Sequence, residues 1–256
     1  METPAKVQAE ITHRYGSLVV HEGLKLALKA NEFLCICGPS GCGKSTLLDI
    51  FAGIIKPSVG HVLIDGEPAD PKRHNISFVF QEPSTLPWLN VRDNIATGLR
   101  IKKRSAAEVR AKVDDIISVV GLRGFEEYYP HQISGGMKQR VSIARAFATD
   151  ADLVLMDEPF VSLDQPTREK MQREVLSIWE HRKRTIVFVT HNLEEAVFLG
   201  DRVIMLSAKP ARIVADLAVD LPRPRNPLSD SFTALRARCV DLLQKMHVEV
   251  ETDEPS

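Results

Sequence analysis

A glycine-rich segment at residues 38–46 constrains the fold of this chain more than any other feature. It follows an apolar run that predicts a buried strand at Phe33–Cys37, and it opens a predicted helix at Lys44–Gly53. The pattern G-x-x-x-x-G-K-[ST] between a strand and a helix is typical of a phosphate-binding loop, because backbone amides and a helix N-terminus then converge on phosphate oxygens. A plain glycine-rich turn is the alternative, and the flanking strand and helix disfavour it.

Further apolar runs rich in β-branched residues alternate with helical patterns along most of the chain. Strands that alternate with helices indicate a largely parallel sheet. From about residue 91 to residue 147 the pattern changes to helices alone, with runs at Ala106–Val120 and Ser134–Phe147, which predicts a separate helical lobe. A short amphipathic helix is predicted at Phe232–Met246. The predicted buried strands are Phe33–Cys37, Ile76–Phe80, Leu153–Met156, Thr185–Thr190 and Arg202–Leu206.

Charge and hydropathy exclude some classes of protein. The chain has 33 basic and 34 acidic residues and a net charge of -1, which argues against a dedicated nucleic-acid binder. No apolar stretch approaches the roughly 20 residues of a membrane-spanning helix, and the first ten residues lack the pattern of a secretory signal. We therefore expect a cytoplasmic protein.

The four cysteines do not have the spacing of a zinc site. Cys35, Cys37 and Cys42 crowd into one strand and its following loop, and Cys239 stands alone, so buried thiols are the favoured interpretation. Cys42 is a separate case, because it lies within the phosphate loop. Backbone amides there are expected to lower the pKa of its thiol and make it reactive when no nucleotide is bound.

Two side chains of the loop and two carboxylates after a strand carry the predicted chemistry. Lys44 is expected to reach the outer phosphates of ATP, and the Ser45 hydroxyl to ligate Mg²⁺. The strand at Leu153–Met156 ends in Asp157 and Glu158, a pair that in isolation is usually a solvated turn. With a phosphate loop in the same chain, we expect Asp157 to hold Mg²⁺ and Glu158 to polarise the attacking water as a general base.

The segment Ile133–Arg140, which reads I-S-G-G-M-K-Q-R, closely resembles the LSGGQ signature of ABC ATPases. Ile133 replaces the usual leucine and Met137 the usual glutamine. Without the other motifs, a serine and two glycines before a helix would be only a capping turn. The resemblance extends from the first strand to about Pro224, because further motifs of the family follow in the expected order.

That resemblance implies roles for the remaining site residues. Gln81 matches the glutamine that ligates Mg²⁺ and reports the nucleotide state to the helical lobe, and His191 matches the switch histidine at the γ-phosphate. Asp164 matches the loop that touches a partner subunit, and Tyr15 stands where the family places a ring against adenine. The expected catalytic residues are Glu158, His191 and Lys44. The expected Mg²⁺ ligands are Ser45, Gln81 and Asp157. The expected ATP-binding residues are Tyr15, Gly38, Pro39, Ser40, Gly41, Cys42, Gly43, Lys44, Ser45, Thr46, Gln81, Ser134, Gly135, Gly136 and Asp164.

The family also implies a fold, with an α/β P-loop NTPase (RecA-like) core, an N-terminal antiparallel β subdomain and an inserted α-helical subdomain. We expect the first part of the core at residues 1–90 and the helical subdomain, with the signature at its end, at residues 91–147. The second part of the core is expected at residues 148–220, followed by a C-terminal tail at residues 221–256.

The resemblance finally implies partners and a setting. In ABC ATPases the signature of one subunit covers the phosphate loop of another, so a dimer is required, with a homodimer as the simplest form. The stretches Gln81–Val91, Arg202–Pro210 and Leu221–Arg225 look like those of nitrate, sulfonate and taurine importer ATPases. Such a subunit works at the cytoplasmic face of the membrane with integral permease subunits and, indirectly, a solute-binding protein, and has no nucleic-acid partner.

The strongest alternative is a soluble ABC-type ATPase that acts in DNA repair or translation. Those proteins usually carry two ATPase domains, or coiled-coil or zinc insertions between the phosphate loop and the signature, whereas this sequence has one compact helical insert. A metabolite kinase would share the phosphate loop but has no need of the signature or of His191. The sequence therefore predicts an ATPase that drives transport.

Overall fold

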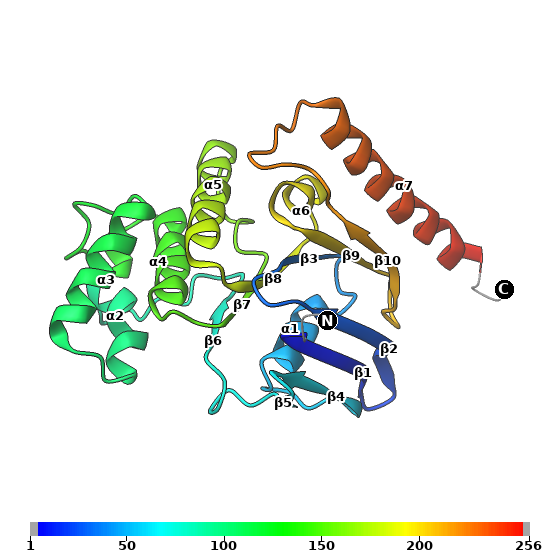
Figure 1. The fold of residues 1–256 in the computed structure, drawn as a ribbon, viewed down its shortest axis with the longest axis horizontal. Coiled ribbons are helices and arrows are strands. Elements are labelled where there is room, and N and C mark those ends of the chain that lie inside the picture. The colour runs from blue at the N-terminus through cyan, green and yellow to red at the C-terminus, as the bar shows by residue number, and fades with distance from the viewer. Residues whose placement is uncertain (1–4, 253–256) are drawn as a thin grey trace. The chain divides into compact units, whose positions relative to one another are not determined.

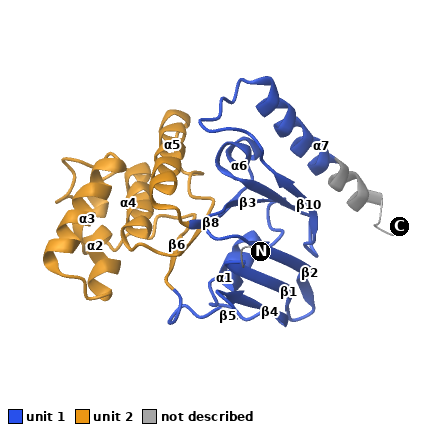
Figure 2. Ribbon diagram, in the orientation of Figure 1, with its two compact units in different colours: residues 1–74, 185–256 blue, residues 75–184 orange. Residues whose placement is uncertain are grey.

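The computed structural model describes residues 5–252, with side chains as far as residue 244, and divides into two compact units (Figures 1 and 2). Unit 1 comprises residues 1–74 and 185–256, and unit 2 comprises residues 75–184. The predicted helical segment 91–147 lies within unit 2, which also contains two strands and a further helix. The first four residues of the predicted core and the last four of the predicted tail lie outside the described residues.

Unit 1 contains an antiparallel sheet with the strand order β2-β1-β4-β5. In its middle, Val7 pairs with Leu28 on one side and with Ile64 on the other. Alternate residues of β1 are buried, as expected for a sheet with one face toward a core. This is the predicted N-terminal antiparallel subdomain, and its strands are β1 (Val7–Tyr15), β2 (Leu18–Leu28), β4 (Val59–Ile64) and β5 (Glu67–Pro68).

A second set of strands in unit 1 follows the order β10-β9-β3-β8. Strand β3 (Phe33–Cys37) runs parallel to β8 (Thr185–Thr190) and to β9 (Arg202–Leu206), while β10 (Ile213–Ala218) is antiparallel to β9. Every residue of β3 and β8 is buried, which requires cover on both faces and explains their uninterrupted apolar sequences. The predicted parallel arrangement of these strands is confirmed.

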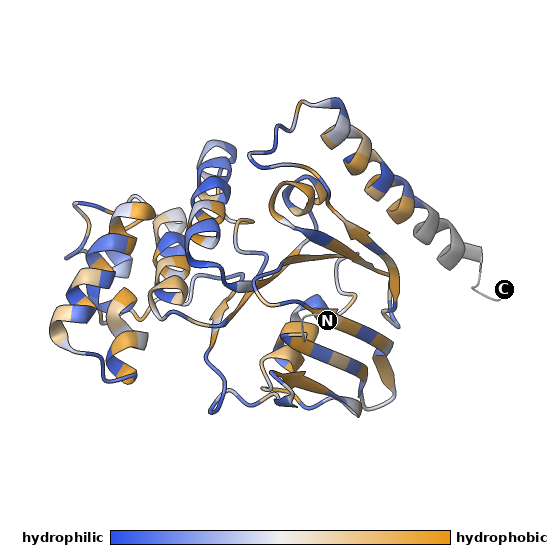
Figure 3. Ribbon diagram, viewed as in Figure 1, coloured by the Kyte–Doolittle hydropathy of each residue, from blue (hydrophilic) through white to orange (hydrophobic). Residues whose placement is uncertain are grey.

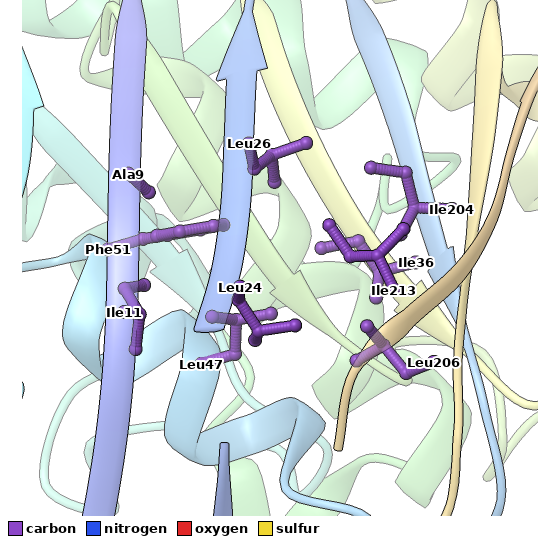
Figure 4. Close-up of a pocket in the computed structure, with 10 residues that line it drawn as sticks. All are labelled: Ala9, Ile11, Leu24, Leu26, Ile36, Leu47, Phe51, Ile204, Leu206 and Ile213. Carbon is purple, nitrogen blue, oxygen red and sulfur yellow. The ribbon is translucent and has the colours of Figure 1, made fainter. Parts of the chain in front are cut away.

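Helix α1 (Lys44–Phe51) anchors the phosphate loop to the core of unit 1. Leu47 and Phe51 of this helix meet apolar side chains from both sets of strands (Figure 4). The space left between them is only about 10 Å³, which is close to the room for one water molecule, and its lining is apolar. It is therefore a packing void. Truncating Phe51 to alanine would be expected to cost about 3–5 kcal/mol.

Unit 2 contains a parallel pair of strands, β6 (Ile76–Val79) and β7 (Leu153–Asp157), and four α-helices. A side-chain oxygen caps the first turn of every one of these helices by accepting a backbone amide hydrogen, which satisfies a donor that has no partner within the helix. The helices and their caps are α2 (Val91–Ile101) with Asn90, α3 (Ala106–Val119) with Ser105, α4 (Gly135–Ala148) with Ser134, and α5 (Gln165–Arg182) with Asp164.

Helix α5 was not among the predicted helices. Most residues of this helix are hydrophilic, as Figure 3 shows. It is nevertheless amphipathic, because Met171, Val175, Ile178 and Trp179 are buried at helical spacing.

The chain returns to unit 1 at β8 and then forms α6 (Leu193–Leu199). The last helix is α7 (Asp230–Thr252), which is longer than the predicted helix at Phe232–Met246. No helix within residues 5–252 combines the length and the apolar character needed to span a bilayer.

Candidate functional site

The glycine-rich segment forms a loop between β3 and α1, as the sequence predicts. Gly41 has a φ of 76° and Gly43 a φ of 108°, a backbone region that side chains disfavour. A Cβ atom on Gly43 would also lie 2.5 Å from Val20 Cγ1, so that position has no room for one. Around Gly41, by contrast, nothing described lies within 4 Å of such an atom.

Three backbone amides of this loop have no backbone acceptor among the described residues. The Cys42 amide donates to the Pro39 carbonyl at 3.3 Å, whereas the amides of Ser40, Gly41 and Gly43 donate to no backbone carbonyl within residues 5–252. Ser40 and Gly41 are exposed. Clustered amides at a helix N-terminus form a site for anionic oxygens, so the loop has the donor set that phosphate requires.

Lys44 is buried at the base of the loop, with 6 % of its surface exposed. Its ammonium group donates to the carbonyls of Gly38 at 2.9 Å and Pro39 at 3.0 Å, both at the start of the same loop. The cation is thus held beside the loop amides. Ser45 is exposed on the first turn of α1 and Thr46 is half-buried.

The expectation for Cys42 is wrong. Its side chain is buried, with 1 % exposed, and burial raises the pKa of the thiol despite the opposing effects of Lys44 and of nearby backbone amides. The thiol packs under the loop, where a Cβ atom on Gly38 would lie 3.1 Å from its sulfur. The other three cysteines are buried and free, as predicted.

The acidic pair stands at the carboxyl end of β7. Asp157 is the last residue of that strand and is buried, while Glu158 is half-buried and has a φ of 41°. A left-handed conformation is uncommon for a glutamate and costs about 1–3 kcal/mol, and such residues cluster at functional sites. The bend turns the chain out of the strand immediately after Asp157.

The signature residues begin helix α4. The Ser134 hydroxyl accepts a hydrogen bond from the Met137 amide at 3.2 Å and caps the helix. A Cβ atom on Gly136 would lie 3.2 Å from Leu163 Cδ2, so the next loop packs closely against that glycine. Gly135 has neither a positive φ nor any described atom within 4 Å of an added Cβ. Nothing in the described part of the chain therefore requires a glycine at position 135.

The remaining predicted residues lie at the ends of their elements. His191 is exposed directly after β8, and the chain around it is fixed because the Thr190 hydroxyl donates to Glu195 at 2.7 Å and accepts from the Asn192 amide at 3.0 Å. Tyr15 is half-exposed and contacts His13 edge-on, with the ring centroids 4.7 Å apart.

Gln81 and Asp164 belong to unit 2. Gln81 is exposed after β6, and the exposed Asp164 accepts a hydrogen bond from the Thr167 amide at 3.0 Å, which lowers the pKa of its carboxyl. Unit 1 thus holds the phosphate loop, Tyr15 and His191, whereas unit 2 holds Gln81, the signature, the acidic pair and Asp164. The contact of Leu163 with Gly136 was not predicted, although an apolar residue in an otherwise polar loop is a signal for such a contact.

A family model described as ABC transporter matches residues 21–161, which is more than half of the chain. The match includes the phosphate loop, Gln81, the signature and the acidic pair. The chain belongs to the ABC transporter family. It is an ATP-binding subunit that hydrolyses ATP, and the predicted P-loop NTPase fold with a β subdomain and a helical insert is confirmed.

Two relatives cover most of this ABC ATPase. It is 45 % identical over 226 residues to an uncharacterized ABC transporter ATP-binding protein of Methanocaldococcus jannaschii, covering 87 % of this chain and 84 % of that protein. It is 42 % identical over 233 residues to the aliphatic sulfonates import ATP-binding protein SsuB of Bacillus cereus, covering 91 % of this chain and 92 % of that protein.

Two solved structures resemble this ABC ATPase over their whole length. One is an ATP-binding cassette in a dimeric post-hydrolysis state with ADP and Pi, with a TM-score of 0.75 and 32 % identity, covering 84 % of this chain and 100 % of that one. The other is cbiO1 of Clostridium perfringens, part of the ABC transporter complex cbiONQ, with a TM-score of 0.76 and 25 % identity, covering 96 % and 98 %.

Proposed function

We propose that this ABC ATPase acts as a dimer at the cytoplasmic face of the membrane and drives an importer of small solutes of the nitrate, sulfonate and taurine type. The proposal rests on the similarity to SsuB, which extends over about nine-tenths of both chains at 42 % identity. Aliphatic sulfonates are therefore the first solutes to test. The near-neutral net charge of -1 gives no support to the alternative of a nucleic-acid enzyme.

The residues of the site suit ATP hydrolysis with Mg²⁺. The loop amides and Lys44 are the proposed phosphate donors, and the side chains of Ser45, Gln81 and Asp157 carry oxygen atoms, the hard ligands that Mg²⁺ prefers. When bound, the ion would neutralise charge on the phosphates. Glu158 would accept a proton from the attacking water, and His191 would donate to the γ-phosphate.

A dimer accounts for the otherwise unexplained glycine of the signature. Gly135 is exposed, and no described atom of its own chain restricts its side chain. If a nucleotide held by a second subunit approaches the N-terminus of α4, a side chain at this position would obstruct it. The similar cassette is dimeric in its post-hydrolysis state with ADP and Pi, which supports a dimer for this chain as well.

A groove between α2 and α3 is the surface that we assign to a permease. Its volume is about 370 Å³, it has an apolar base of Ala96, Val109 and Val113, and four arginine residues surround it. These are Arg92, Arg100, Arg104 and Arg110.

The charge of the groove indicates which segment would bind there. Arg92 pairs with Asp114 and Arg100 with Asp93, both at 2.5 Å. Arg104 pairs with Glu108 at 3.7 Å, whereas Arg110 has no ion-pair partner within residues 5–252. An exposed arginine beside an apolar base favours a short cytoplasmic helix of the permease with one carboxylate and one apolar face. Trp88 is 70 % exposed and adds apolar surface before α2.

The first test is to purify the tagged protein from gently solubilised membranes and to identify the proteins that accompany it. We expect an integral permease. Recovery of ribosomes or DNA-repair factors without any permease would overturn the transporter role. The assignment of the protein as an ATPase would still stand.

A charge reversal tests the groove itself. Arg110→Glu should abolish permease recovery while the isolated subunit keeps its ATPase rate, because residue 110 is on α3 and not among the nucleotide residues. Arg173→Glu, on the exposed face of α5, is the matched control and should keep the permease. Equal recovery with both variants would rule out the groove as the docking surface.

Solute choice requires the whole complex. In vesicles that contain the permease, the solute-binding protein loaded with an alkyl sulfonate should raise the ATPase rate, whereas the empty binding protein should not. Stimulation by nitrate or taurine instead would assign the solute within the proposed class, and stimulation by none of the three would reject that class.

A further inference from the structure

A buried histidine supports the phosphate loop from behind. His21 on β2 has no exposed surface, and its Nε2 atom lies 3.0 Å from the carbonyl oxygen of Gly43. Gly43 is the residue immediately before Lys44 and precedes the first turn of α1. The contact joins residues 22 positions apart in the sequence, and both belong to unit 1.

The geometry fixes which nitrogen of this imidazole carries a hydrogen. A carbonyl oxygen only accepts, so Nε2 carries the hydrogen and His21 is the donor. Its Nδ1 atom is buried and has no hydrogen-bond partner among the described residues. Burial, opposed by the bond to Gly43 and reinforced by His13 and Lys209, lowers the pKa of His21 to about 4. The ring is therefore neutral at physiological pH.

The Gly43 carbonyl fixes the direction of the next amide. It accepts hydrogen bonds from both His21 and the Leu47 amide, the latter at 2.9 Å. Because a peptide unit is planar and trans, the carbonyl of Gly43 and the N–H of Lys44 point in opposite directions. Two donors on the carbonyl side thus orient the Lys44 amide toward the opposite side of the loop.

The histidine is itself held rigidly. On either side of it, the Val20 carbonyl accepts from the Ala211 amide at 2.8 Å, and the Glu22 amide donates to the Ala211 carbonyl at 3.1 Å. His21 also packs closely against the loop, since a Cβ atom on Gly43 would lie 2.8 Å from its Nε2 atom. Main-chain hydrogen bonds on both sides of His21 therefore hold the backbone in place, while its side chain donates to the loop.

We propose that His21 is a positioning residue for nucleotide binding, which aims the Gly43–Lys44 peptide at the phosphates by donating from Nε2 to the Gly43 carbonyl. The proposal rests on the assignment of residues 38–46 as the phosphate-binding loop. This positioning role requires a neutral hydrogen-bond donor at the position of Nε2. A side chain that only fills the same volume would not fulfil it.

Three variants separate the donor from the volume. His21→Gln places an amide nitrogen close to the position of Nε2, His21→Asn places one too short to reach, and His21→Leu has none. We expect ADP and ATP to bind about tenfold more weakly to the Asn and Leu variants, the factor that corresponds to one lost hydrogen bond. The Gln variant should bind within about threefold of the wild type.

Titration calorimetry on the full chain measures these affinities, and thermal unfolding without nucleotide establishes that each variant is folded. In steady-state hydrolysis, the Asn and Leu variants should have a raised KM with a smaller change in kcat, because Glu158 is untouched. Equal affinity in all three variants and the wild type would overturn the proposal. Equal weakening in all three, Gln included, would also overturn it, because the ring would then act only by its volume.

Lys44→Ala distinguishes a failure of this proposal from a failure of the loop assignment. If Lys44→Ala binds ADP as tightly as the wild type, residues 38–46 are not the phosphate site, and the role of His21 is rejected together with it. If Lys44→Ala loses ADP while His21→Leu binds normally, the loop assignment stands and the positioning role alone is rejected.

Discussion

Two single residues at the end of a buried strand are the ones that we propose carry the chemistry of this ABC ATPase. Asp157 ends β7 inside the protein, with 8 % of its surface exposed, and the left-handed backbone of Glu158 turns the chain out of the strand in one step. Two adjacent carboxylates thereby occupy different environments. Different environments allow different roles, with one carboxylate suited to an ion and the other to a proton transfer.

Substitution of Glu158 tests that division. Glu158→Gln keeps the size and polarity of the side chain but removes the base, so ATP turnover should fall by about 10²–10⁴-fold. ATP should still bind, because the phosphate donors belong to a different loop, and the dimer should accumulate with ATP bound. A colorimetric phosphate assay and gel filtration with ATP check both points. Equal turnover in the variant and the wild type would exclude Glu158 as the base.

Lys44→Ala should fail at the earlier step. It removes the ammonium group that lies at the base of the loop, and charge-assisted hydrogen bonds to phosphate are worth enough to weaken ATP binding about tenfold or more. The measurement is a fluorescent-nucleotide titration. A variant that binds nucleotide as tightly as the wild type would instead reject residues 38–46 as the phosphate site.

At the level of elements, the end of α6 depends on a residue from the C-terminal segment. Arg225 is 7 % exposed, and its guanidinium donates to the carbonyls of Val197 at 2.8 Å and Gly200 at 2.6 Å. The last carbonyls of a helix have no partners within it, so an arginine there acts as a cap. Burial lowers the pKa of Arg225 to about 10, and the group is still charged at neutral pH. The segment around Arg225 is therefore part of the fold.

Arg225→Met should lower the free energy of unfolding by about 2–4 kcal/mol, because buried carbonyls lose their donor. Arg236→Met is the matched control. Arg236 forms an exposed ion pair with Glu194 at 3.0 Å, and such pairs contribute about 1 kcal/mol or less. Urea denaturation of both variants measures the difference, and similar midpoints would contradict a capping role for Arg225.

In unit 2, an acidic residue at a chain reversal joins two helices. Burial alone would raise the pKa of the Asp150 carboxyl. The positive charges of Lys112 on α3, Arg182 on α5 and Arg184 outweigh that effect, so the pKa lies below its ordinary value. A carboxyl whose pKa is lowered by folding stabilises the fold above its unfolded pKa of about 3.9. That contribution is lost as the pH falls through the lower folded value.

Asp150→Asn should therefore be less stable than the wild type at pH 7, by about 1 kcal/mol or less because the carboxylate is partly exposed. The difference should shrink as the pH falls below about 4. Asparagine tolerates the φ of 51° at this position, so the backbone is not the variable. Unfolding curves between pH 3 and pH 7 check the trend, and a constant difference across that range would contradict it.

The strands and the motifs could be predicted from sequence because their signals are contiguous. The strand β3 reads as five apolar residues because it is covered on both faces, and the phosphate loop follows it directly. Helix α5 was missed, since only a narrow stripe of its surface is buried. The contacts of His21 with Gly43 and of Arg225 with α6 join residues more than 20 positions apart, and no local pattern encodes them.

On the scale of the whole molecule, the proposed dimer implies that two copies complete each site. The loop amides of unit 1 and the signature of unit 2 each present donors on exposed turns. An isologous pairing, in which the loop of each copy meets the signature of the other across a two-fold axis, would give two equivalent sites and a closed dimer. Each site would then need one intact loop and one intact signature from different chains.

Mixing two inactive variants tests that arrangement. Lys44→Ala disables the loop, and Gly135→Asp places a carboxylate in the open space at the signature, so each homodimer should be inactive. In an equal mixture about half of the dimers are mixed, and each mixed dimer has one intact site of two, so about a quarter of the wild-type sites should return. The phosphate assay at saturating ATP measures the recovery against each variant alone. If the mixture is no more active than its components, either the sites are not shared between chains or a dimer with one intact site does not hydrolyse ATP. Cross-linking of the ATP-bound mixture, through cysteines introduced beside Ser40 and Ser134, decides between these two explanations.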